Sequence, residues 1–353
     1  WMKNGRLPLA CPVSIDQCSL DLRHSAKGRS LSVSHLTLAP NETGSAVLMQ
    51  AQRSTLEGVG TTGAISGKLD AVEGRALLAV ALPSTDLSRL GVNRRIAGTF
   101  KGVLTVAVTS LWKKRPQTAF SAVGVVPKGF ASIPRFPDKH EFRGNLKLQV
   151  ASPNQRTALG YGARFYFQGW SSLLGNSKAS ILWPPESRQF HGTVICPSVP
   201  LRTLQSLNNK PLPFVLEGGR ARVALDFRGN GPSTLNLQSL SQVSCRHLNG
   251  RLTFRRATLR WRTSDQRIAD LAGTTSFAFA GHPLTARSVD LRFFSKPGWF
   301  NALSVVGRSS SGNRWQTHLE GKGVDIPQLN RFFAWTNPAF LKRGRVDGYV
   351  DLT

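Results

Sequence analysis

Few residues in this chain have the types and spacing that catalysis needs. Residues 58–63 spell Gly-Val-Gly-Thr-Thr-Gly, a match to the dinucleotide fingerprint. That motif binds a pyrophosphate only between a strand and an amphipathic helix, and no helical pattern follows it. Thr62 also stands where a phosphate-binding loop ending at Gly67-Lys68 would require glycine. We therefore predict a turn between strands here and no nucleotide site.

Metal and acid–base chemistry are equally hard to assemble. The seven histidines are scattered, and only Cys245 and His247 are close enough in sequence to share a metal ion. Two ligands do not make a structural site, which usually takes about four. The 19 Asp and Glu residues are too sparse to suggest a general acid–base pair. The sequence predicts that the chain is not an enzyme and binds no cofactor or metal.

The cysteines and the chain ends give weaker indications. Cys11 and Cys18 are able to form a disulfide in an oxidising compartment, and unpaired small hydrophobic residues explain the four cysteines equally well. No apolar run reaches the roughly 18 residues that span a bilayer. Because the chain starts at Trp1 and stops within an alternating apolar pattern, we expect it to be a piece of a longer protein.

The net charge of +27 favours a negatively charged partner. Nucleic acid, anionic lipid headgroups and an acidic protein would each be attracted to this positive charge, and the charge alone does not distinguish among them. A general excess of arginine that only keeps the chain soluble is a further reading of the same number.

Alternation of apolar and polar residues is the dominant structural signal. It runs through residues 103–108, 223–227, 252–254, 277–279 and 289–293, and a period of two is typical of half-buried strands. Asn249-Gly250 and residues 281–283 read as hairpin turns, and residues 127–137 as a loop or a break between strands. The predicted fold is all-β: an elongated, curled antiparallel sheet that forms a groove, with short helices between its modules.

One composite pattern occurs three times. A leucine-rich segment begins near Leu87, Leu201 and Ile326, and each copy is followed by glycines and a strand. Asp86 and Asp325 are able to cap a short helix in the first and third copies, and Pro200 starts the second. The spacing implies repeats of about 115–125 residues. The predicted segments are a weakly assigned β-rich stretch at 1–82, groove modules at 83–200 and 201–325, and the start of another at 326–353.

These residues resemble the AsmA-like superfamily, and within it the TamB (translocation and assembly module) proteins of bacterial envelopes and their cyanobacterial and plastid relatives. The resemblance covers residues 196–353 well, 83–195 loosely and 1–82 hardly at all. It rests on a leucine-rich helix followed by a Gly-Arg strand start, seen as Leu201, Leu204, Leu207, Gly218, Gly219 and Arg220, and as Ile326, Leu329, Phe332, Gly344 and Arg345.

The resemblance implies a sheet curled into a trough, apolar inside and polar outside. Such proteins are anchored in an inner membrane, in the periplasm or the plastid intermembrane space. They carry lipid between membranes or assist the assembly of outer-membrane β-barrel proteins with an Omp85-type partner. A single sheet must cover its apolar face, and bound acyl chains would do so. The candidate lining is Val223, Leu225, Phe227, Leu252, Phe254, Phe277, Phe279, Leu291 and Phe293. The core of an ordinary β-sandwich would give the same alternation.

Arginines between these apolar residues form the second candidate set. They are Arg220, Arg222, Arg255, Arg256, Arg260 and Arg262, proposed to contact an anionic surface. Aromatic residues among arginines suit nucleic acid, but strict alternation places the two kinds on opposite faces of a strand. The alternative function is therefore a non-conducting basic scaffold for polyanions or an acidic protein, with nucleic acid the less favoured ligand.

Overall fold

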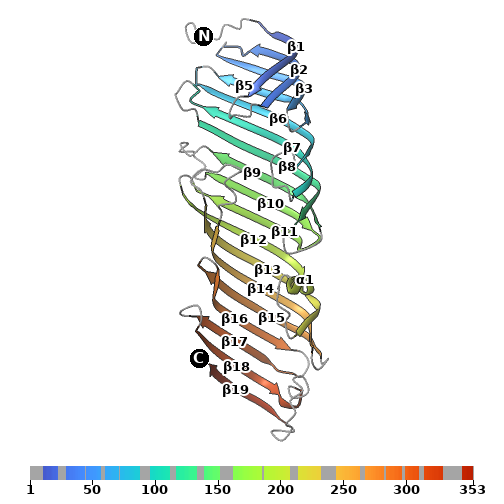
Figure 1. Cartoon of the computed structure of the whole chain (residues 1–353), viewed down its shortest axis with the longest axis vertical. Helices are drawn as coiled ribbons and strands as arrows, with labels where there is room; N and C mark the ends of the chain where they lie inside the picture. The colour runs from blue at the N-terminus through green and yellow to red at the C-terminus, as the bar shows by residue number, and fades with distance from the viewer. Residues whose placement is uncertain are drawn as a thin grey trace. The chain divides into compact units, whose positions relative to one another are not determined.

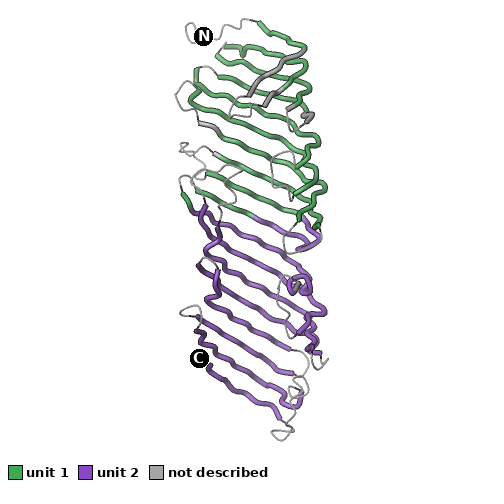
Figure 2. Tube along the Cα trace, viewed as in Figure 1, with its two compact units in different colours: residues 1–169, 180–188, 232–241 green, residues 170–179, 189–231, 242–353 purple. Residues whose placement is uncertain are grey.

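The computed structural model describes most of the chain and divides it into two compact units (Figure 2). Unit 1 comprises residues 1–169, 180–188 and 232–241, and unit 2 comprises the remaining residues. The described residues are 11–22, 29–43, 45–56, 60–70, 72–87, 96–111, 117–132, 139–151, 162–184, 187–206, 214–231, 244–262, 267–281, 284–295, 299–309, 314–328 and 344–352. Within them no helix has both the length and the apolar character to cross a bilayer.

Unit 1 is an antiparallel meander. Its strands are β1 (Val13–Leu22), β2 (Arg29–Pro40), β3 (Ala46–Leu56), β4 (Gly60–Thr62), β5 (Ile65–Asp70), β6 (Arg75–Asp86), β7 (Ile96–Thr109), β8 (Gln117–Ser132) and β9 (Lys139–Ala151). Each strand pairs with the next, except that β4 and β5 pair with successive parts of β3 as one interrupted strand. Strands β10 (Ala163–Ser171) and β11 (Gly175–Trp183) contribute residues to both units.

Unit 2 is also an antiparallel meander (Figure 1). It contains β12 (Gln189–Pro200), the helix α1 (Leu201–Ser206), β13 (Phe214–Asn230), β14 (Ser244–Trp261), β15 (Arg267–Ala280), β16 (Thr285–Ser295), β17 (Ala302–Ser309), β18 (Trp315–Asp325) and β19 (Arg345–Leu352). Every neighbouring pair from β12 to β19 is antiparallel. The predicted all-β antiparallel fold is confirmed, because short apolar alternation and few helix formers leave only strands to bury the apolar side chains.

A row of β-bulges crosses unit 2. The register shifts at 196–199 in β12, at 216–220 in β13 and at 254–257 in β14. These shifts lie side by side, because Ala221 pairs with Val199 on one neighbour and with Phe254 on the other. A bulge places two consecutive residues on one face and bends its strand. Aligned bulges therefore bend the sheet of this unit along one line.

Unit 1 has a corresponding row of bulges. Shifts occur at 82–85 in β6, at 99–101 in β7 and at 126–129 in β8, and Pro83 and Pro127 both lie at these sites. The predicted loop or break at 127–137 is therefore corrected for residues 127–132, because β8 continues to Ser132 and tolerates Pro127 at a bulge, while residues 133–137 lie outside the described residues. The most deeply buried side chains of the unit, such as Phe100 and Val126, lie on the inside of this bend.

The same connection follows β6, β12 and β18. In the first copy the backbone N–H of Leu87 donates to the carbonyl of Gly98 at 2.8 Å, and in the third Ile326 donates to Gly344 at 3.3 Å. In the second copy Leu201 opens α1 and is buried against Gly219. The predicted cap by Asp325 is confirmed, since its Oδ1 accepts the N–H of Gln328 at 3.0 Å. Each repeat therefore contains six strands, while the predicted module boundaries themselves remain predictions.

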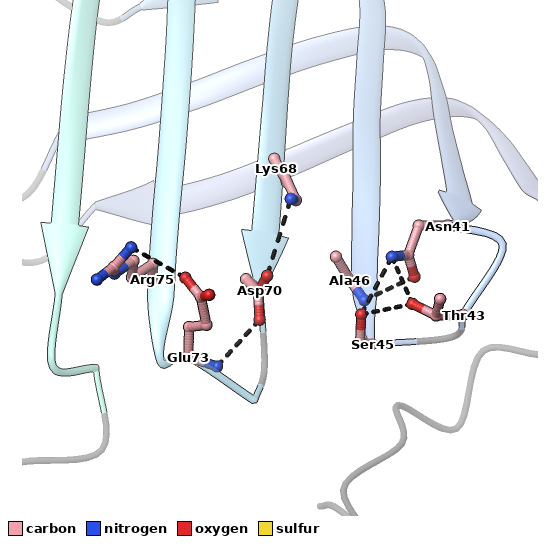
Figure 3. A network of polar contacts seen from close by, with 8 residues as sticks. All are labelled: Asn41, Thr43, Ser45, Ala46, Lys68, Asp70, Glu73 and Arg75. Atoms are coloured by element: carbon pink, nitrogen blue, oxygen red, sulfur yellow. Dashed lines mark hydrogen bonds and ion pairs between the residues drawn. The ribbon is translucent and has the colours of Figure 1, made fainter.

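Polar turns close two hairpins of unit 1, β2–β3 and β5–β6, at one end (Figure 3). The side-chain amide of Asn41 donates to Thr43 Oγ1 at 2.9 Å and to Ser45 Oγ at 3.1 Å, and its Oδ1 accepts the N–H of Ala46. At the next hairpin Asp70 Oδ1 accepts the N–H of Glu73 at 3.0 Å. These side chains satisfy backbone donors that a turn leaves without a strand partner.

Candidate functional site

All nine predicted lining residues lie on one side of the ladder in unit 2. Register partners in an antiparallel sheet point to the same face. Val223 pairs with Leu252, Phe277 with Val289, and Phe293 with Leu303. The remaining members join the same face through their own partners, because Leu252 pairs with Thr275 and Thr275 with Leu291. We call this side of β12 to β19 the apolar face.

Exposure divides the apolar face into two parts. Val223 and Phe254 are 8% and 7% exposed and belong to the core cluster at the bulges. Leu225, Phe227, Leu252, Phe277, Phe279, Leu291 and Phe293 are each partly exposed. Residues at the bend are therefore structural core, and residues farther along the strands keep apolar surface that other groups can reach. The β12–β19 ladder is one sheet, and the described residues of unit 2 supply no second sheet of the kind that a sandwich core requires.

Phenylalanine rings on the apolar face lie across glycines of the neighbouring strand. Phe227 faces Gly192, Phe277 faces Gly250, and Phe254 faces Gly273 as direct register partners. A Cβ built on Gly273 would lie 2.7 Å from Cζ of Phe254, and one built on Gly250 would overlap the tip of Phe277. Each ring thus covers backbone instead of standing away from the sheet. Apolar ring surface therefore covers the backbone at these three glycines.

The ring–glycine pairs correct the predicted hairpin turn at Asn249-Gly250. Asn249-Gly250 lies inside β14, paired with Asp226 and Leu225 of β13, and makes no hairpin turn. The dipeptide has the residues of a tight turn, but the ring of Phe277 replaces the side chain that Gly250 lacks. This cross-strand partner belongs to the next strand along the chain, so no local pattern reveals it.

The register also adds residues that the sequence left out of the lining. Val194, Cys196, Leu248, Val289, Leu303 and Val305 occupy the same face. Their signal was present as the same period of two in neighbouring strands. In unit 1 the equivalent face carries Val80, Leu104 and Ala122, which are partners in successive strands.

The predicted arginines lie mostly on the opposite side, which we call the outer face. Arg220, Arg222 and Arg255 are exposed there, and Arg256 is exposed at the bulge with a φ of 54°. Arg262 is exposed just beyond the end of β14. Arg260 differs, because its Nε lies 2.6 Å from Glu217 Oε1, and Arg267 also contacts that carboxylate at 3.2 Å. An internal partner therefore already balances the charge of Arg260.

Unit 1 departs from the expected polar outer face. Leu48, Leu77, Val103, Val123 and Val125 point away from the buried cluster and are 42–49% exposed. The run at 103–108 is apolar at both parities, so its alternation does not assign one polar face. The expectation of a polar exterior holds for the arginine-rich region of unit 2 and is wrong for this part of unit 1.

The motifs set aside in the sequence have structural roles or none. Gly60–Thr62 forms β4 and is followed by β5, so the fingerprint lacks its helix. Cys245 Sγ lies 3.3 Å from the carbonyl oxygen of His247, and no cluster of three metal-ligating side chains occurs in the described ranges. A depression of about 280 Å³ at the β5–β6 turn is lined by Lys68, Asp70, Glu73 and Arg75 among others, and these charges pair with one another (Figure 3).

Three cysteines are free thiols in different surroundings. Cys11 is exposed and unbridged, so it makes no disulfide with Cys18. Burial raises the pKa of Cys196, which is 1% exposed on the apolar face. Burial also raises the pKa of Cys245, opposed by a hydrogen bond with the backbone of His247. The thiolate is the reactive form, so reactivity should differ sharply among them.

We expect iodoacetamide to alkylate Cys11 first and Cys196 only on unfolding. Raising the pH should leave the reaction at Cys196 slow, because burial keeps this thiol both inaccessible and protonated. Because burial raises the folded pKa of Cys196, its contribution to stability is present below the unfolded value and declines as pH rises through the folded value. Peptide mass spectrometry over a pH series measures both rates, and equal rates at the two cysteines would contradict the burial of Cys196.

Comparison with known proteins gives no relative. No family model matches the chain, and no curated protein and no solved structure is significantly similar to it.

Proposed function

We propose that the chain is a segment of an envelope-spanning bridge of the TamB type, whose apolar face carries lipid acyl chains between membranes. The same face would also suit unfolded strands of outer-membrane β-barrel proteins, handed to an Omp85-type partner. In this proposal the parent protein is anchored in an inner membrane and crosses the periplasm, or the corresponding space of a plastid envelope.

The observation that supports the proposal is the separation of residue types by the two faces of unit 2. Nine predicted apolar residues share one face, and seven of them keep part of their surface exposed. Burial of hydrocarbon gains roughly 0.8 kcal/mol for each methylene, whatever the shape of the chain. Rings that lie flat across glycines would offer such a ligand apolar surface without a shaped pocket to fit, which suits flexible chains of varied structure.

Phe279→Asp is the sharpest test of this face. Phe279 is partly exposed and packs edge-on against Phe277, with ring centroids 5.7 Å apart. A carboxylate there would sit against hydrocarbon, so we expect at least about a tenfold loss of bound lipid, from the cost of burying a charge. The measurement is mass spectrometry of lipid that co-purifies with the chain, supported by crosslinking to a photoactivatable fatty acid.

Ser276→Asp is the matched control. It introduces the same charge in the same strand, but Ser276 is exposed on the outer face between its register partners Arg251 and Asp290. It should keep its lipid, and both variants should keep the sheet signal in circular dichroism. Phe254 is unsuitable for the test, because it is buried at the bend and its loss would unfold the unit. Absence of lipid from the unaltered chain, or equal loss in both variants, would refute the conduit.

A further inference from the structure

Five arginines form an unneutralised patch on the outer face of unit 2. They are Arg220 and Arg222 of β13 and Arg251, Arg255 and Arg256 of β14, and all five are exposed. Arg220 and Arg255 are direct register partners. Arg251 is separated from Arg222 by one diagonal step, because Arg222 pairs with Thr253. We call these five residues the arginine patch.

No carboxylate within the described part of the chain forms an ion pair with the arginine patch. The nearby acids have other partners: Asp226 contacts His191 at 2.6 Å, Glu217 contacts Arg260, and Asp290 contacts Arg292 at 3.2 Å. Asp270 is exposed at the bulge of β15 and has no ion pair with the patch. Among the residues that the structure describes, Arg220 donates to Ser198, at 2.5 Å to Oγ and 3.3 Å to the carbonyl oxygen.

Like charges directly opposite each other on a sheet destabilise it. The Arg220–Arg255 pair carries that cost, and the described part of the chain supplies no acid to relieve it. An external anion would relieve it, and the planar fork of a guanidinium matches the oxygens of a phosphate. Several phosphates side by side would suit the patch, since its members are spread over two strands.

Two observations favour lipid phosphates over a nucleic acid. The aromatic residues interleaved with these arginines in β13 and β14, such as Phe254, lie on the apolar face, so these two strands offer no row of rings on which successive bases could stack beside the cations. Phe294 of β16 is 50% exposed on the outer face, partnered with Ala272 of β15. An exposed aromatic beside a basic patch is typical of a surface that rests in the headgroup layer of a bilayer.

We infer that the arginine patch binds the phosphates of an anionic membrane surface. This inference concerns the outer face and does not depend on a conduit on the apolar face. It places unit 2 against a lipid surface through Arg220 and Arg255, with Phe294 entering the headgroup layer. The binding requires no bond making and no cofactor.

The test compares two double variants of the chain with the same net charge. Arg220→Gln with Arg255→Gln removes the opposed pair, and Arg53→Gln with Arg164→Gln removes two exposed arginines elsewhere. Flotation with phosphatidylcholine vesicles, with and without phosphatidylglycerol, measures binding at low salt. We expect anionic vesicles alone to bind the chain, and the first variant to bind about 30-fold more weakly, while the control changes little. The unfolding temperature of the first variant should rise, which shows that it remains folded.

Three outcomes would overturn the inference. Equal losses in the two double variants would show that binding reflects net charge alone. Failure of the unaltered chain to bind anionic vesicles would show that an anionic membrane is not the ligand of the arginine patch. Tighter binding of a single-stranded oligonucleotide, lost in the first variant, would assign the patch to nucleic acid. Co-purified lipid on the apolar face should be the same in both variants, so this test fails or succeeds separately from the proposed conduit.

Discussion

Gly250→Val is expected to destabilise unit 2 by about 3 kcal/mol, the upper end of the usual cost of overpacking. The valine side chain would occupy the space held by the tip of the Phe277 ring, so the ring must leave its place against β14. The displaced ring would lose contacts with the backbone that it now covers. Urea denaturation followed by circular dichroism measures the change in the free energy of unfolding.

Gly348→Val is the matched control for Gly250. Gly348 also lies within a strand, β19, but a Cβ there would have no heavy atom within 4 Å. Valine should therefore be neutral, or stabilise by up to about 1 kcal/mol, because glycine in a strand is disfavoured. The double variant Gly250→Val with Phe277→Ala should recover part of the loss, since valine then meets no ring. An equal effect of valine at both glycines would show that the Phe277–Gly250 contact contributes nothing.

Gly98→Ala should have a comparable effect on unit 1. Gly98 has a φ of 133°, which side chains rarely adopt, and its Cβ would lie 2.5 Å from both the Cα of Gly129 and the carbonyl oxygen of Lys128. Backbone strain costs about 1–3 kcal/mol, and a clash with backbone atoms that cannot move adds about as much again. We expect a loss of about 2–6 kcal/mol from these two costs together, read from the same denaturation experiment.

Gly344→Ala separates the two components. Gly344 occupies the equivalent place in the third copy, with a φ of 136°, and a Cβ added there would have no heavy atom within 4 Å. Alanine there should carry only the backbone strain, so its cost should be about 1–3 kcal/mol. A cost at Gly98 no larger than that at Gly344 would show that the close approach of β7 to β8 is relaxed easily.

The sequence predicted the faces of the sheet better than its bends. A period of two placed Val223, Phe277 and Leu291 on one face correctly, because antiparallel partners preserve that alternation from strand to strand. The three leucine-rich segments also marked the connections that recur after every sixth strand. Both signals are local and repeat often enough to be recognised in a single chain.

The bends depend on residues that carry no local signal. Arg256 and Asp270 adopt positive φ values of 54° and 53° at adjacent bulges. Aspartate tolerates that conformation better than most residues, but arginine is an unusual residue for it. The bulge is fixed by the need to keep Phe254 and Ala257 on the same face at the core. Likewise the exposed arginine patch was visible as charge, but the direct opposition of Arg220 and Arg255 requires the register between β13 and β14.

The six-strand recurrence has a consequence for how such a chain can change in length. In an antiparallel meander each strand reverses direction, so an even number of strands returns the chain to its original heading. Insertion or loss of a whole repeat, such as β7 to β12 or β13 to β18, would leave the following strand running the same way. The apolar face and the outer face of the later strands would keep their orientation. Duplication of an odd number of strands would reverse the direction of every later strand. The segments that connect those strands would then lie at the opposite strand ends.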